Sequence, residues 1–155
     1  MRRLRLTFAF LCLAGVLFAG KIAAQNSSPA QAGTYSGMYS FLQDGEFVQV
    51  TIEDAGHVTG FISRYGESES DRGTFLDHFF KEGKLEGQKL SFATQVVHGV
   101  SFEFHGSFER GPGKTSADEA YFLLKGTLIE STSDANQKTS SKSREVTFKS
   151  FPKET

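Results

Sequence analysis

Four histidines are the side chains of this 155-residue chain best suited to acid–base or metal chemistry, because imidazole titrates near neutral pH. They are His57, His78, His98 and His105. His105 shares the predicted outer face of a strand with Glu103, which predicts a surface pair. His78 is next to Asp77, but neighbours in a strand point to opposite faces, which argues against a dyad. The other two fall in predicted turns, and we expect no metal site unless the fold gathers three of the four.

Recognisable catalytic and cofactor motifs are missing from the sequence. It has no Gly-x-Ser-x-Gly elbow, no His-Glu-x-x-His pair, no phosphate loop and no dinucleotide fingerprint. Glu67, Glu69 and Asp71 alternate as calcium ligands sometimes do, but the downstream Glu and the turn-forming glycine of a calcium loop are missing. We therefore predict no catalytic residues and no cofactor, and a solvated loop at 65–73.

Residues 1–24 predict a secretory signal peptide. A basic head at 1–5 precedes an apolar run at 6–20, and Ile22-Ala23-Ala24 stands before the expected cleavage point. The run of about 15 residues is shorter than the roughly 20 that a spanning helix needs, and an uncleaved anchor is the alternative. Cys12 follows Leu11, where a lipid-attachment box requires a small residue. We expect export to the periplasm or extracellular medium, with no stable membrane anchor after cleavage.

Removing residues 1–24 leaves an acidic chain without cysteine. Four of the 17 basic residues and none of the 18 acidic ones lie in that segment, so 13 basic residues remain against 18 acidic ones, a net charge of −5. No stripe of cations is available to displace phosphate counterions, which argues against nucleic-acid binding. The one cysteine, Cys12, is also removed, which excludes a disulfide, a thiol nucleophile and Cys-ligated zinc.

The rest of the chain has the period-two pattern of strands joined by short turns. Asp44-Gly45 and Ala55-Gly56 are tight-turn signals, and residues 74–86 fit either a bulged strand or, over 75–80, a helical turn. Residues 25–33 predict a disordered tether, 34–151 one folded domain and 152–155 a short tail. Strands are predicted over 35–42, 47–54, 58–64 and 74–86, in both halves of a hairpin at 90–110, and over 120–130 and 144–151. Polar loops are predicted at 65–73, 111–119 and 131–143.

Interior glycines in several strands permit the bends that curl a sheet. They are Gly37, Gly60, Gly83, Gly106 and Gly126. Eight antiparallel strands with no helix between them predict an all-β fold, a single antiparallel up-and-down β-barrel of about eight strands.

Three short segments resemble the calycin group, the lipocalin and avidin-like barrels. Gly33-Thr34-Tyr35 stands where such barrels often open with Gly-x-Trp, and Leu123-Leu124 with Val146-Thr147-Phe148-Lys149 is similar to their last two strands. The resemblance implies a barrel whose interior can hold a small ligand. Avidin-type biotin pockets are walled by tryptophan, and this chain has none, so the resemblance does not imply biotin binding.

Aromatic and aliphatic residues at alternating positions form the expected inner wall of the barrel. The candidate ligand-binding wall is Phe92, Phe102, Phe104, Phe108, Phe122 and Leu124. The sequence leaves open whether these side chains fill the barrel or line a cavity suited to a small apolar ligand.

Three functions stay open, in this order. The first is a secreted, non-catalytic barrel that binds a small apolar ligand. The second is an envelope or extracellular interaction module that meets an unknown protein partner through the loops at 65–73, 111–119 and 131–143. The third is an isomerase or cyclase working inside a barrel, as in dirigent-type proteins, with His78, Glu82 and Tyr121 as its polar groups; this hypothesis rests on analogy of fold alone.

Overall fold

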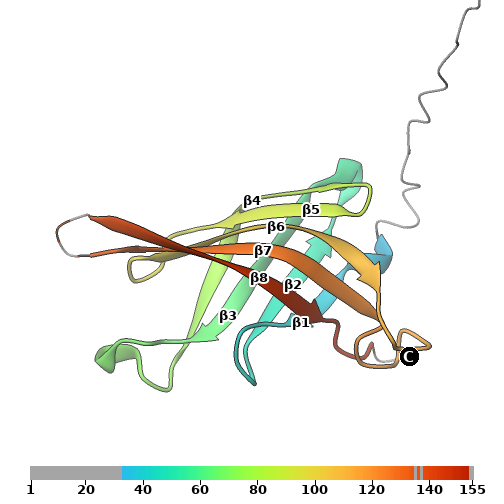
Figure 1. Cartoon of the computed structure of the whole chain (residues 1–155), viewed down its shortest axis with the longest axis horizontal. Helices are drawn as coiled ribbons and strands as arrows, with labels where there is room; N and C mark the ends of the chain where they lie inside the picture. The colour runs from blue at the N-terminus through green and yellow to red at the C-terminus, as the bar shows by residue number, and fades with distance from the viewer. Residues whose placement is uncertain (1–32, 135, 137, 154–155) are drawn as a thin grey trace, which may run out of the picture.

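The computed structural model describes residues 33–134, 136 and 138–153, so the predicted signal peptide and most of the predicted tether lie outside the described residues. In this part of the chain eight strands form one curled antiparallel sheet; one short 3-10 turn precedes the first strand and two more lie between strands (Figure 1). The elements are η1 (Gly33–Tyr35), β1 (Gly37–Ser40), β2 (Phe47–Ile52), η2 (Asp54–Gly56), β3 (Val58–Tyr65), η3 (Glu69–Asp71), β4 (Phe75–Glu86), β5 (Lys89–Thr94), β6 (Val100–Arg110), β7 (Phe122–Ser133) and β8 (Thr139–Lys149). Within the described part of the chain, no helix has the length and apolar character that crossing a membrane requires.

The strands follow one another around the sheet in the order of the sequence. Every neighbouring pair from β1 to β8 is antiparallel, which short connections allow and parallel pairing would not. The end of β8 returns to β1, where Tyr39 pairs with Ser150 and the Phe151 amide donates to the Met38 carbonyl at 2.9 Å. The predicted up-and-down arrangement of eight strands is confirmed, and the seam is short because β1 has only four residues.

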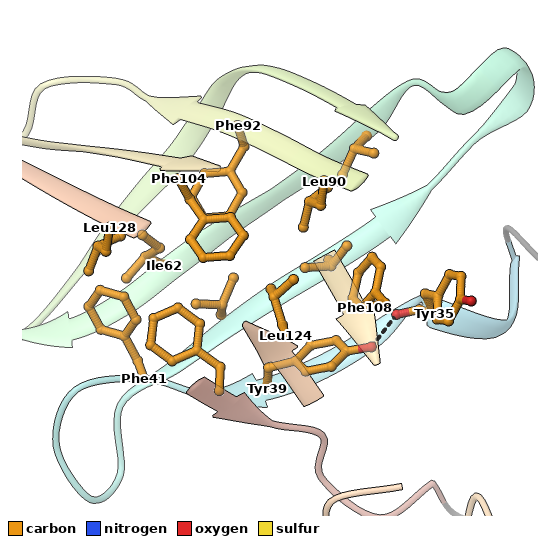
Figure 2. Packing of buried hydrophobic residues seen from close by; sticks show 14 of the residues in the cluster. Tyr35, Tyr39, Phe41, Ile62, Leu90, Phe92, Phe104, Phe108, Leu124 and Leu128 are labelled. Atoms are coloured by element: carbon orange, nitrogen blue, oxygen red, sulfur yellow. Dashed lines mark hydrogen bonds between the residues drawn. The ribbon is translucent and has the colours of Figure 1, made fainter. Parts of the chain in front are cut away.

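The inward face of the sheet is apolar and tightly packed (Figure 2). Every residue of the predicted wall is buried, and rings from neighbouring strands contact each other: Phe92 stacks on Phe104 with ring centroids 5.3 Å apart. Phe104 in turn lies 6.0 Å from Phe148 on β8. The alternation in the sequence therefore correctly places these side chains on the inward face of the sheet. Around Phe92, Phe104 and Phe148, packed side chains fill the interior of the barrel.

Tyr35 closes one end of the barrel. Its ring stacks on Phe108 at 4.5 Å and meets the edge of Phe122 at 4.9 Å, while its backbone carbonyl accepts a hydrogen bond of 2.7 Å from the Tyr39 hydroxyl. Figure 2 shows the rings of Tyr35 and Phe108 side by side, with the hydrogen bond from Tyr39 dashed. We call this the closed end, defined by Tyr35, Phe108 and Phe122. The Gly-Thr-Tyr segment thus supplies an aromatic plug.

The uncertain stretch at 74–86 is a bulged strand, and the alternative of a helical turn at 75–80 is wrong. β4 runs from Phe75 to Glu86, and its pairing with β5 shifts register between Phe80 and Glu82. The extra residue bends the strand, as a β-bulge does, where the sheet turns from β3 towards β5.

The predicted loop at 131–143 is also wrong, because most of it is β-structure. β7 and β8 pair without interruption from Leu123–Lys149 to Ser133–Thr139. Hydroxyl groups hold the outer part together: Ser131 and Ser141 approach to 2.9 Å, and Ser133 and Thr139 to 3.0 Å. Such cross-strand pairs stabilise a sheet without any apolar alternation. In Figure 1 this hairpin projects beyond the rest of the barrel.

Candidate functional site

Charged side chains gather at the end of the barrel opposite Tyr35. There β3 ends and β4 begins, and Arg64 follows Ile62 at the next inward position of β3. His78 pairs directly with Ile62 across the β3–β4 ladder, so its side chain also points inward. We call this end the mouth, defined by Arg64, Glu67, His78, Glu130 and Arg144.

Arg64 is a buried cation with few charged contacts. It is 5% exposed, its Nε donates to His78 Nε2 over 3.3 Å, and its Nη1 donates to Glu67 Oε1 over 3.0 Å. The guanidinium carbon lies 5.4 Å from the centre of the Phe102 ring. Its one carboxylate partner among the described residues, Glu67, has a side chain that is 66% exposed. Moving a guanidinium out of water costs several kcal/mol, and an ion pair with a mostly exposed carboxylate offsets little of that desolvation cost.

His78 is uncharged in the folded barrel at neutral pH. Its ring is fully buried and meets Phe102 edge-on at 5.2 Å. Burial, followed by the charge of Arg64, lowers the pKa of His78 from 6.5 to about 4, although the backbone of Val100, the Asp77 carboxylate and the backbone of Gln95 act in the opposite direction. Because arginine only donates, Nε2 accepts and Nδ1 carries the proton. That Nδ1 makes no hydrogen bond of ordinary geometry with the described residues.

Glu46 fixes the loop between β1 and β2 beside these groups. It is buried, and its two carboxylate oxygens accept the backbone amides of Tyr65 at 3.0 Å and Gln43 at 3.1 Å. It makes no ion pair with Arg64 in the described part of the chain, so its charge is committed to backbone donors.

The hairpin of β7 and β8 forms one side of a polar hollow at the mouth. The inner face of this hairpin continues past the apolar core and carries an ion pair in which Arg144 Nη2 lies 2.5 Å from Glu130 Oε2. The hollow has a volume of about 460 Å³. Its lining is Glu67, Glu130, Thr132, Ser140, Ser141, Lys142 and Arg144. Glu67 is therefore both a wall of this hollow and the carboxylate partner of Arg64.

The six residues of the predicted wall do not form one ligand surface at the mouth. Phe102 is the member in contact with Arg64 and His78. Phe108 and Phe122 belong to the closed end, and the remaining members pack in the core between the two ends. Their burial is established, whereas their contact with a ligand stays a prediction.

The three polar groups of the enzyme hypothesis lie apart. His78 is in the mouth, and Tyr121 lies beneath the Arg110 guanidinium at 3.5 Å, next to Phe122 of the closed end. Glu82 lines a separate, open hollow of about 500 Å³ on the outer surface of the barrel. No hydrogen bond or ion pair joins any two of them within the described residues, so the structure does not assemble this trio.

The other histidines are exposed and paired with carboxylates. His105 lies 2.6 Å from Glu103, which confirms the predicted surface pair. His98 bridges to Asp71 at 2.8 Å and thereby ties the β5–β6 turn to the β3–β4 loop. Nowhere in the described residues do three His, Cys, Asp or Glu side chains gather as metal ligands.

The sequence interpretation missed Arg64, although a signal for it was present. Inward positions of β3 recur every second residue through Val58, Gly60 and Ile62, and the same step reaches Arg64. The Glu130–Arg144 pair has no such local signal, because it depends on the register of two strands whose outer parts are polar.

Comparison with known proteins identifies the fold. No protein-family model matches the chain, and no curated protein matches it in sequence. The solved structure of rhizavidin matches with a TM-score of 0.59 at 10% identity, over 83% of this chain and 91% of that one. A rhizavidin–biotin complex gives 0.58 at 10% identity, over 77% and 95%. A complex of short afifavidin with biotin gives 0.56 at 13% identity, over 79% and 98%. The chain has the fold of a calycin-like, avidin-type barrel, as the resemblance in sequence predicted.

Proposed function

We propose that this avidin-type barrel is an exported, non-catalytic protein that binds a small molecule at the mouth. The observation that carries the proposal is the burial of Arg64. A cation 5% exposed, beside an uncharged histidine and a mostly exposed carboxylate, lowers the stability of the fold. Natural sequences accept such local costs chiefly at functional sites.

The mouth is a better site than the interior proposed from the sequence. In the interior, Phe92 stacks on Phe104 and on Phe80 at 4.2 Å, so a wholly apolar ligand would have to separate stacked rings. Protein interiors are close-packed, and opening such a space costs several kcal/mol. A ligand at the mouth needs no such rearrangement, because the hollow beside Glu67 already exists.

The outer hollow near Glu82 is a weaker candidate. Its charged side chains, Glu82, Lys84 and Glu103, are all exposed to solvent, and His57 and His105 are each paired with a carboxylate. None of these groups bears the energetic cost that burial imposes on Arg64.

The matched structures support the class of function. Two of them are complexes with biotin, so a barrel of this fold accommodates a small ligand. We do not extend biotin itself to this chain, which contains no tryptophan. Export is proposed from the pattern of residues 1–24, and N-terminal sequencing of the protein recovered outside the cytoplasm tests it, since a start at Gln25 is expected.

The interaction-module hypothesis has less support from the structure. Of its three loops, 131–143 is largely a hairpin. The loop at 111–119 is held by Asp118, which accepts the amides of Lys114 and Thr115 at 2.8 Å. A protein partner meeting these segments stays a prediction.

A fragment screen by two-dimensional ¹H–¹⁵N NMR tests the proposed site. We expect binding fragments to shift the amide signals of Arg64, Glu67 and His78, and we expect Arg64→Met to weaken those fragments while Glu82→Gln in the outer hollow does not. Shifts confined to the outer hollow, or equal binding by both variants, would contradict the proposal.

A further inference from the structure

Glu67 is the carboxylate that offsets the charge of Arg64 at the mouth. Two other carboxylates near this end have partners of their own: Glu130 pairs with Arg144, and Glu46 accepts backbone amides. When Glu67 turns away, Arg64 keeps no carboxylate partner among the described residues, and its positive charge is uncompensated.

Glu67 is the carboxylate that can leave most easily. Its side chain is 66% exposed and sits on the loop between β3 and β4, three residues after Arg64. A change of rotamer is enough to carry the exposed Glu67 side chain into water, where solvent replaces its lost contact. The cost falls on Arg64, which stays buried without a carboxylate until an anion binds. Arg64 itself cannot follow, because His78 and Phe102 hold its guanidinium inside the barrel.

The position that Glu67 vacates is suited to a carboxylate. Guanidinium groups bind carboxylates and phosphates through parallel N–H donors, and the bond is strongest where water is excluded. The hollow beside it offers the hydroxyls of Thr132 and Ser140 and the ammonium of Lys142 as further donors. A neutral ligand would leave the charge of Arg64 uncompensated when Glu67 moves.

We propose that the ligand of the mouth is a small organic anion, with a carboxylate or phosphate group that displaces Glu67 from Arg64. Glu67 is then an internal competitor, which occupies Arg64 when the ligand is absent. This inference rests on the proposed function and adds the chemical class of the ligand.

Matched probes separate the anion from its neutral equivalent. Phenylacetate and phenylacetamide have nearly the same shape and differ in charge, while phenyl phosphate distinguishes a phosphate preference from a carboxylate one. Isothermal titration calorimetry on the whole exported chain compares the wild type with Glu67→Gln, Arg64→Met and Glu69→Gln. The last is a control for an acidic residue of the same loop that does not contact Arg64.

We expect phenylacetate to bind at least tenfold more tightly than phenylacetamide. Glu67→Gln removes the competitor and should tighten phenylacetate binding roughly three- to tenfold, while phenylacetamide binding stays unchanged. The control Glu69→Gln should bind both probes as the wild type does. Arg64→Met should weaken the binding of phenylacetate at least tenfold. A thermal unfolding curve of this variant shows that it is folded. Equal binding of the two probes would overturn the inference and leave the proposed function standing.

A titration with acetate separates the two claims if no aromatic probe binds. In Glu67→Gln, acetate should shift the Arg64 Nε–Hε NMR signal, and phosphate is the second arm. A shift there without binding of any aromatic probe supports the anion site and rules out the aromatic body of the probes as the recognised part. Binding of phenylacetamide with no shift by acetate supports the proposed function and overturns the inference. No shift with acetate, phosphate or any probe overturns the inference.

Discussion

Acidification should destabilise this barrel through His78, and the size of the effect follows from its surroundings. The folded-state pKa of His78 is about 4, against 6.5 for the free side chain, because the ring is buried and the Arg64 charge is beside it. Between these pH values the unfolded chain binds a proton that the folded chain does not. The free energy of unfolding therefore falls with falling pH, by about 3 kcal/mol from pH 7 to pH 4.

Urea unfolding at pH 7, 5.5 and 4.5 measures this effect in the wild type and in His78→Gln. Glutamine keeps an acceptor for Arg64 Nε but does not titrate. By pH 4.5 the wild type should have lost about 2 to 3 kcal/mol more than the variant. Carboxylates with lowered pKa, such as Glu53 and Asp71, weaken both proteins alike in acid, so they cancel in the comparison. His105→Gln, which changes an exposed histidine, should follow the wild type. Parallel curves for wild type and His78→Gln would refute the reasoning.

Three further changes test the packing. Gly126→Ala should cost more than about 2 kcal/mol, because a Cβ there would lie 2.2 Å from the His105 carbonyl oxygen. Gly73→Ala should cost less, about 1 kcal/mol, because its new Cβ would meet no atom within 4 Å and only the φ of +79° is unfavourable; equal urea midpoints would contradict this. Tyr35→Ala should cost about 3 to 5 kcal/mol by removing the plug against Phe108, and a melting temperature within a degree of wild type would argue against a closed end. The backbone amides at 131–133 and of Ser140, which have acceptors in neighbouring strands, should exchange slowly with deuterium if the hairpin forms, whereas a loop there would exchange them within seconds.

The period-two pattern correctly predicted which aromatic residues face the core, because that depends only on burying one face of each strand. Phe102, Phe104 and Phe108 are inward and buried because alternating apolar residues allow one register with the core. The outer part of the β7–β8 hairpin was missed because serine and threonine on both faces carry no such pattern, and their cross-strand hydroxyl contacts are not local in sequence.

The mouth was harder to predict than the wall. Arg64 lies on the alternation of β3, but a charged residue near the end of a strand ordinarily faces water, and its burial follows from the tertiary packing of Phe102 against it. The link from Arg64 through Glu67 to the Glu130–Arg144 pair joins three separate segments, so it exists only once the sheet has curled.

The role of Arg64 as an anion anchor is tested most directly by its own side-chain signal. The Arg64 Nε–Hε resonance of the wild type should shift and saturate as phenylacetate is added, and should not respond to phenylacetamide. A resonance that stays unmoved at every phenylacetate concentration, in a protein shown to be folded, would contradict this account of the mouth.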